Sequence, residues 1–571
     1  MTSRLMQALT RFKRMMYRLF RWSRLLQVDS QHFEEVFLVR ELAEMVSQTV
    51  QVYNSSTLIA REWINHYFVA VVLVNSLSTP LVRRVVKHPI ALQRLVCVLV
   101  DIGLDMATCI GLPLIIVFPY FQHFDAATFT MDDAILYDIS QFVNLVMEIR
   151  QMFARSTFDL VMKTLPHASI FSCLGSIQWL LRPMRGKRTE RDSSDPRVQP
   201  QQRQLSIPEG RAINGPVLHA VAPAVRDLKE AVKPVCIQQR LIPTKSHLRH
   251  KVALTHATIV FWGCCIVVLH LLAAFLTNRG QPPGCRLLYH PWFSTSYTCS
   301  VYEYNCHRQG TASPEEEFLA VLDRKALTAL VISHCPDLVV PTSIQQFHNL
   351  VGFEIWNSTI ASWTKVSALT QATHPLLTYV CLVGANMTSI PEGLLQDLPY
   401  ELDDIEITHS DLSFLPDDLD SRWANVSVVF IEHTALTAFP DILARMEISD
   451  LSLIGNSITS LPDITTGDVG FFKLSLSNTL LVTLLEHIGS LSNLQFVALE
   501  NTLLEELSAW IYKIEKQAIK IFLAGTPFCV SKSASELATR YGPDAVTTCA
   551  DTSQQVDGRY PYEHMRASQE P

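Results

Sequence analysis

Acidic and aromatic residues recur through the second half of the sequence, about every two dozen positions. Carboxylates set between exposed aromatic rings suit a basic protein or peptide, because the rings anchor the ligand and the charge steers it. We therefore predict a ligand-binding face there, and the alternative is an acidic face that is merely solvated. The assigned residues are Glu354, Trp356, Glu406, Thr408, Phe430, Glu432, Ile454, Glu500 and Phe522, flanked by Asp403, Asp404 and Asp450.

Catalytic motifs are missing from the sequence. It contains no GxxxxGK[ST], GxGxxG, HExxH or GxSxG pattern and no kinase motif set. We expect no enzyme activity, no cofactor and no nucleic-acid partner. His256, Cys264, Cys265 and His270 lie in one apolar stretch, where single His and Cys residues usually pack against other helices rather than bind a metal.

A repeating apolar pattern positions the acidic and aromatic residues. Residues 450–464 contain Leu451, Leu453, Ile458 and Leu461, followed by Pro462. The same frame starts at residues 327, 350, 377, 402, 426, 448, 471, 494 and 518, with spacings of 22 to 27 residues. The alternative interpretation, an array of amphipathic helices with leucines spaced by chance, does not account for one shared register.

The pattern resembles that of the leucine-rich repeat family, L-x-x-L-x-L-x-x-N/C-x-L, over residues 327–528. The resemblance implies an α/β leucine-rich repeat solenoid of about nine repeats, in which each coil buries its apolar edge against its neighbours and ligands bind the concave face. The ninth position departs from the family pattern. Asn456 keeps the asparagine, Ala385 cannot replace it, and the substitutes are Cys335, Ser358, Ser410, Thr434, Thr479, Thr502 and Thr526.

Cysteines flank the repeats, as in the caps of secreted leucine-rich repeat proteins. Cys529 and Cys549 follow the last coil, and Cys381 is expected to be a buried thiol on a strand. Four more cysteines lie ahead of the repeats or within the first one, and they allow three disulfide pairings, which the sequence leaves open. These cysteines are Cys285, Cys299, Cys306 and Cys335.

The chain is 48% apolar with a mean hydropathy of +0.18, which indicates membrane spans. Residues 252–276 carry no Asp, Glu, Lys or Arg and are long enough to cross a bilayer. Residues 64–82 and 95–121 are further candidates. In one arrangement 95–121 crosses the membrane and residues 169–181 return the chain, whereas in the other both 64–82 and 95–121 cross it. Asp101 and Asp105 are expected to line an ion path or to contact a basic residue of a neighbouring helix.

The distribution of charged residues predicts on which side of the membrane the repeats lie. The part after residue 276 has 16 basic and 34 acidic residues, net −18, whereas the part before it carries +11. The positive-inside rule places the basic linker in the cytosol and the repeats outside the cell, at the plasma membrane. Glycosylation sequons at Asn357, Asn386 and Asn425 favour the same side.

The N-terminal 26 residues contain seven basic residues and no acidic one, with apolar residues at helical spacing. This pattern predicts a helix on an anionic lipid surface, and a mitochondrial transit peptide is the minority alternative. We divide the chain into this basic amphipathic region (1–63), a helical membrane region (64–182), a basic cytosolic linker (183–251), a transmembrane helix (252–276), an N-terminal cap (277–326), the repeats (327–528), a C-terminal cap (529–550) and a disordered tail (551–571).

The predicted architecture is a leucine-rich repeat solenoid attached to an α-helical multi-pass membrane region. We expect an integral membrane protein that acts in extracellular recognition or adhesion, through a protein or peptide ligand of basic character. The alternative is a channel or membrane scaffold subunit, similar to four-span channels that carry such repeats in the cytosol. The sequence fixes neither the ligand nor the oligomeric state.

Overall fold

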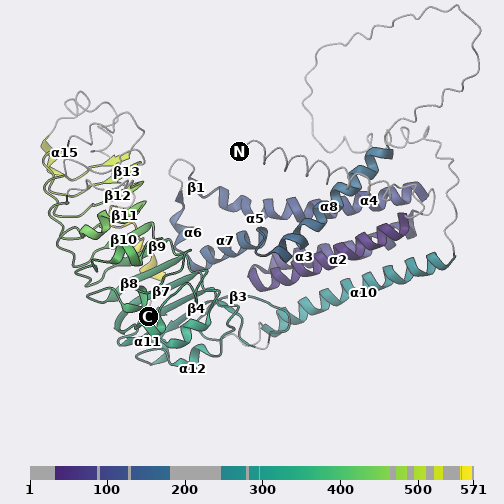
Figure 1. Ribbon diagram of the computed structural model, residues 1–571, viewed down its shortest axis with the longest axis horizontal. Coiled ribbons are helices and arrows are strands. Elements are labelled where there is room, and N and C mark those ends of the chain that lie inside the picture. Colours follow the sequence, from purple (N-terminus) through teal and green to yellow (C-terminus); the bar gives the residue numbers. More distant parts are fainter. Residues whose placement is uncertain are drawn as a thin grey trace, which may run out of the picture. The chain divides into compact units, whose positions relative to one another are not determined.

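The computed structural model describes residues 33–86, 90–125, 130–180, 246–277, 282–294, 296–462, 471–484, 494–508, 520–531, 549, 553 and 556–568 (Figure 1). The predicted N-terminal surface helix, most of the basic linker and most of the C-terminal cap lie outside these residues. The chain forms two compact units. One consists of Met1–Leu42, Ser78–Ile102 and Ala168–Thr258, and the other of Ala43–Leu77, Gly103–His167 and Ile259–Pro571.

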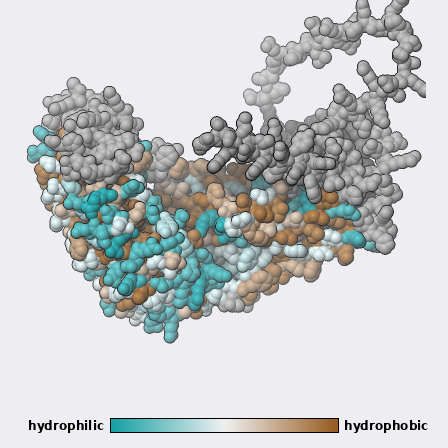
Figure 2. All heavy atoms as spheres, viewed as in Figure 1, coloured by the Kyte–Doolittle hydropathy of each residue, from teal (hydrophilic) through white to brown (hydrophobic). Residues whose placement is uncertain are grey.

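The first part of the chain is helical, as its apolar stretches predict. Among the residues that the structure describes, three helical segments are long and apolar enough to cross a membrane: Glu62–Val85, Leu92–Phe121 and His250–Thr277. Figure 2 shows apolar side chains gathered over the helices and polar ones over the repeats. The helices are α2 (Phe33–Leu58), α3 (Glu62–Val85), α4 (Ile90–Met106), the π-helix η1 (Ala107–Gly111), α5 (Leu112–Phe121), α6 (Asp133–Leu136), α7 (Ile139–Met152), α8 (Thr157–Leu180) and α10 (Ser246–Thr277).

Buried charges in the helices meet charges of opposite sign. Asp101 on α4 forms an ion pair with Arg40 on α2, which confirms for Asp101 the expected contact with a basic residue of a neighbouring helix. Glu34 accepts hydrogen bonds from Arg83 at 2.7 Å and Arg94 at 3.1 Å. Desolvation opposes an isolated buried charge, so each of these carboxylates gains from the arginine beside it.

Repeats form one parallel sheet, and each strand begins two residues after a predicted repeat start. Its strands in this frame are β5 (Ala329–Ser333), β7 (Gly352–Ser362), β8 (Tyr379–Asn386), β9 (Asp404–Thr408), β10 (Val428–Glu432), β11 (Asp450–Ser452), β12 (Lys473–Ser475), β13 (Phe496–Ala498) and β14 (Lys520–Phe522). The register is continuous, with Val380, Ile405, Val429, Leu451, Leu474, Val497 and Ile521 on successive strands. These residues point into the core, because successive side chains of a strand alternate between its two faces.

The turn after each strand explains why the ninth position tolerates change. Asn456 donates hydrogen bonds from Nδ2 to the carbonyl oxygens of Ile431 (2.7 Å) and Leu453 (2.8 Å). At Thr479, Thr502 and Thr526 the hydroxyl donates to the carbonyl oxygen three residues back at 2.8 Å. The Thr434 hydroxyl donates to Asn456 Oδ1 instead, at 2.6 Å. The residue just before takes a positive φ, a conformation open to Gly, Asn and His. These residues are His334, Asn357, Gly384, His409, His433, Gly455, Asn478, Asn501 and Gly525.

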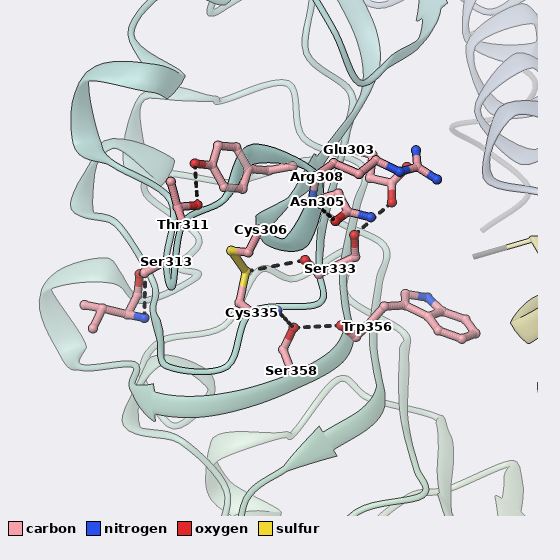
Figure 3. Close-up of a disulfide and its surroundings, with 12 residues drawn as sticks. Glu303, Asn305, Cys306, Arg308, Thr311, Ser313, Ser333, Cys335, Trp356 and Ser358 are labelled. Carbon is pink, nitrogen blue, oxygen red and sulfur yellow. Dashed lines mark hydrogen bonds between the residues drawn. A yellow bond between two sulfur atoms is a disulfide. The ribbon is translucent and has the colours of Figure 1, made fainter. Parts of the chain in front are cut away.

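Strands β3 (Cys285–Leu288) and β4 (Cys299–Asn305) extend the sheet before the first repeat. Strand β4 pairs with β5 in parallel, and β3 pairs with β4 in the antiparallel direction. The six predicted cysteines form three disulfides, Cys285–Cys299, Cys306–Cys335 and Cys529–Cys549. Figure 3 shows the second of these joining the residue after β4 to the turn after β5. Cys381 is a buried free cysteine, as expected.

The C-terminal tail differs from the predicted disorder. Residues 556–568 are described, and they include helix α18 (Tyr562–Ser568). Tyr560 is 3% exposed and Arg559 is 7% exposed, so this polar segment buries two large side chains. Its order comes from contact with the repeats rather than from its own composition.

Candidate peptide-binding face

The outward side chains of the strands form aligned rows. In the middle row, Glu354, Cys381, Glu406, Phe430, Ser452, Ser475, Ala498 and Phe522 lie opposite one another across β7 to β14. Beside it, Trp356, Val383, Thr408 and Glu432 form a second row. The structure therefore brings most of the predicted face residues together, and Ile454 and Glu500 lie two residues after the ends of β11 and β13. We call this surface the concave face.

Most of the concave face is covered rather than exposed. Eight of the nine predicted residues are at most 5% exposed, and only Phe522 is not fully buried. The covering groups come from the same chain, namely the tail and the loop between α6 and α7. Periodicity alone places a side chain on a face, but it does not reveal a distant segment that packs there.

Backbone and arginine of the tail bind two carboxylates of the face. Glu432 accepts hydrogen bonds from the backbone N–H groups of Arg559 (2.8 Å) and Tyr560 (3.2 Å). Arg559 donates to both oxygens of Asp450, at 3.2 and 2.9 Å. Its guanidinium lies over the rings of Phe430 (5.2 Å) and Phe496 (5.7 Å). We call Asp450, Glu432, Phe430 and Phe496 the arginine site.

Tyrosines of the tail pack on aromatic residues of the face. Tyr562 stacks on His409, with ring centroids 3.7 Å apart, and lies parallel to Trp356 at 6.3 Å. Tyr560 approaches Trp356 at 6.0 Å. Burial beside His433 lowers the pKa of His409 to about 4, so the ring that meets Tyr562 is neutral at physiological pH.

Three further contacts hold the tail before Arg559. Ser553 donates to Glu500 from its hydroxyl at 2.8 Å and from its backbone N–H. Asn478 donates to the carbonyl oxygen of Val556 at 2.9 Å, and His433 Nε2 lies 2.5 Å from that of Asp557. The tail therefore follows the face over several coils.

Residues between α6 and α7 cover another part of the face. The Tyr137 hydroxyl donates to Glu406 at 3.1 Å and lies 3.5 Å from the carbonyl oxygen of Arg559. Tyr137 and Tyr560 meet edge to face at 5.1 Å. Phe142 of α7 meets Tyr379 in the same way, also at 5.1 Å. Two separate segments thus share one binding surface.

Burial dominates the electrostatics of the face. It raises the pKa of Asp404 to about 8, with Asp450 and Asp403 adding to the effect, and raises the pKa of Glu354 to about 7. Burial and the nearby Asp404 also raise the pKa of Glu406. Burial opposes the charge of Arg559, but the neighbouring Asp450 raises the pKa of the guanidinium. Burial thus favours the neutral forms of Asp404, Glu354 and Glu406, whereas Asp450 favours the charged form of the guanidinium beside it.

The repeat spacing predicts which residues share one side of the sheet, but it does not predict the segments that cover that side. In that prediction Asp450 is only a flanking residue, and Arg559, Tyr560 and Tyr562 lie in a tail expected to be disordered. Two tyrosines flanking Pro561 next to an arginine, within a polar stretch, are the signal that could have indicated a packed segment. The predicted sequon residues Asn357, Asn386 and Asn425 are all exposed, and their glycosylation stays a prediction.

The sequence matches no protein-family model and no curated protein. Solved structures that resemble it include the leucine-rich repeat domain of the type III effector XopL, at 15% identity over 53% of this chain and 93% of that chain (TM-score 0.29). A Leptospira interrogans leucine-rich repeat protein is 18% identical over 40% of this chain and 74% of that chain (TM-score 0.28). A chain of the octameric complex of latrophilin 3, Unc5D and FLRT2 is 12% identical over 37% of this chain and 72% of that chain (TM-score 0.30).

These likenesses are too low to carry an argument. The class of fold, a leucine-rich-repeat-like solenoid with a parallel sheet, rests instead on the strand register and the repeating core of this chain.

Proposed function

We propose that this protein is a membrane-anchored recognition protein that binds a protein or peptide ligand through the concave face and catalyses no reaction. The observation that carries the proposal is the arginine site, where Glu432 and Asp450 hold an arginine-containing peptide segment. Backbone N–H groups bound by a carboxylate and an arginine between two rings are typical of peptide recognition.

The membrane arrangement is part of the proposal. In the part of the chain that the structure describes, three helical segments have the length and composition of spans, and the excess of basic residues lies on the N-terminal side of the last one. Exposed sequons and three disulfides support repeats outside the cell, because disulfides form and persist in oxidising compartments. We assign the protein to the plasma membrane on these grounds.

Ligand capture tests recognition. A photo-crosslinking form of the full-length protein carrying Arg559→Ala and Tyr560→Ala, which opens the concave face, should capture a ligand on intact cells, and adding Asp450→Asn should reduce that capture. Asp417→Asn is the matched control, because Asp417 is exposed and lies outside the face. Binding of the captured ligand should weaken with salt, since charge attraction is screened. Capture indifferent to both Asp450→Asn and salt would contradict the proposal.

A second candidate is a channel or scaffold subunit with cytosolic repeats. The observation that favours it is the set of buried ion pairs between helices, Arg40–Asp101 and Glu34 with Arg83 and Arg94. Charged groups within apolar helices often mark an ion path. Endoglycosidase and external protease separate the candidates: unglycosylated, protease-protected repeats would favour the channel or scaffold.

A further inference from the structure

The C-terminal segment 556–562, Val-Asp-Gly-Arg-Tyr-Pro-Tyr, occupies the concave face in the manner of a bound peptide. Its backbone bonds Asn478, His433 and Glu432, while its side chains fill the arginine site and contact Trp356. Backbone contacts of this kind do not depend on the identity of the side chain. The side-chain contacts select an arginine followed by an aromatic residue.

Arginine fits this site better than lysine. Both oxygens of Asp450 receive a hydrogen bond from the one guanidinium, which also lies over the rings of Phe430 and Phe496. An ammonium group is a compact point charge, which forms neither the paired bonds nor the planar stacking. The site therefore discriminates between the two basic side chains.

The face keeps internal partners when the tail leaves. Lys473 Nζ lies 3.6 Å from Asp450, so that carboxylate still has a cation beside it. Burial and the nearby Arg559 both lower the pKa of Lys473, which indicates that two cations compete for one carboxylate. Ser452 also donates its hydroxyl to Glu432. Removing the tail thus leaves neither carboxylate unpaired, and this lowers the cost of release.

We propose that residues 556–562 are an intramolecular ligand of the arginine site, and that the external partner is a protein segment presenting an arginine followed by an aromatic residue, which displaces them. The inference rests on the proposed recognition function and names both its ligand chemistry and its regulation. The tethered tail competes for the arginine site at a high effective concentration. A partner therefore binds tightly only after the tail has been released, or when the partner concentration is high enough to displace it.

A labelled synthetic peptide, VDGRYPY, tests the proposal on the full chain in lipid nanodiscs. Two variants release the tail: the double substitution Arg559→Ala/Tyr560→Ala, and a chain ending at residue 555. Because a short tether supplies on the order of millimolar effective concentration, both variants should bind the peptide at least ~10-fold more tightly than the intact protein. Far-ultraviolet circular dichroism checks that each variant is folded.

Site variants and a changed peptide test the chemistry. Asp450→Asn in the chain ending at 555 should weaken peptide binding by about 10-fold, whereas Asp417→Asn should leave it unchanged. Replacing the peptide arginine with lysine should weaken binding by roughly 5-fold or more.

The outcomes separate the inference from the function on which it rests. Equal peptide affinity for intact and tail-released proteins would overturn the intramolecular ligand alone. Failure of tail-released proteins to bind the peptide, while the captured cell-surface ligand still binds, would overturn the arginine–aromatic specificity alone. Loss of both peptide and cell-surface binding would overturn the recognition function as well.

Discussion

Glu354 illustrates how a carboxylate behaves on the covered face. Tyr379 and Trp356 donate hydrogen bonds to it at 3.2 and 3.3 Å. Burial raises its pKa from 4.5 to about 7, a shift that Arg286 opposes and Glu303 supports. Its folded pKa exceeds its unfolded pKa, so the stability it contributes is complete below pH 4.5 and is lost as the pH rises through 7.

Glu354→Gln should therefore stabilise the protein at high pH only. Glutamine stays neutral and can bond the same two partners. We expect the free energy of unfolding at pH 8 to rise by up to about 3 kcal/mol, with little change at pH 4. Thermal unfolding of both proteins at the two pH values measures this, and a substitution effect that is the same at pH 4 and pH 8 would refute it.

Asn456 should be the most sensitive of the ninth-position residues. Its amide nitrogen bonds carbonyl oxygens of two neighbouring coils, and its Oδ1 accepts from the backbone N–H of Thr434 at 3.1 Å. Asn456→Ala should lower the free energy of unfolding by about 1–3 kcal/mol, because buried backbone groups lose their partners. Denaturant unfolding measures this. Asn349→Ala, which removes one surface hydrogen bond to Lys325, should cost less.

At the scale of elements, disulfides secure the start of the sheet. The Cys306–Cys335 bond closes a stretch with a sequence separation of 29 and joins the cap to the first repeat (Figure 3). Cys306→Ser together with Cys335→Ser should lower stability by about 3 kcal/mol, since the unfolded chain regains freedom. Thermal unfolding without reductant provides the comparison. Cys264→Ser, at an exposed free cysteine, should change little, and an equal loss there would contradict this role.

The elements also show how far sequence reasoning reaches. Nine repeat starts predict nine strands, because the apolar period reports directly which residues face the core. The predicted face is found for the same reason, since outward residues are the complement of inward ones. The tail at Arg559 and the loop at Tyr137 are not predicted, because each is short and packs on residues more than a hundred positions away in the sequence.

At the scale of the whole molecule, the proposal joins a recognition face to apolar helices. If the repeats lie outside the cell, the three sequons can be glycosylated. Full-length protein from animal cells should then shift to lower mass after endoglycosidase treatment. Asn357→Gln, Asn386→Gln and Asn425→Gln together should abolish that shift. A triple variant that still shifts, or a wild type that never does, would contradict the assignment of these sites.

The most direct test of the account is amide hydrogen exchange of residues 556–562 in the intact protein. Glu432 binds the amides of Arg559 and Tyr560, so these two should exchange at least about tenfold more slowly than in the isolated peptide VDGRYPY. Asp450→Asn should remove most of that protection, and Asp417→Asn should not. Exchange in the wild type as fast as in the isolated peptide would contradict a tail bound to the concave face.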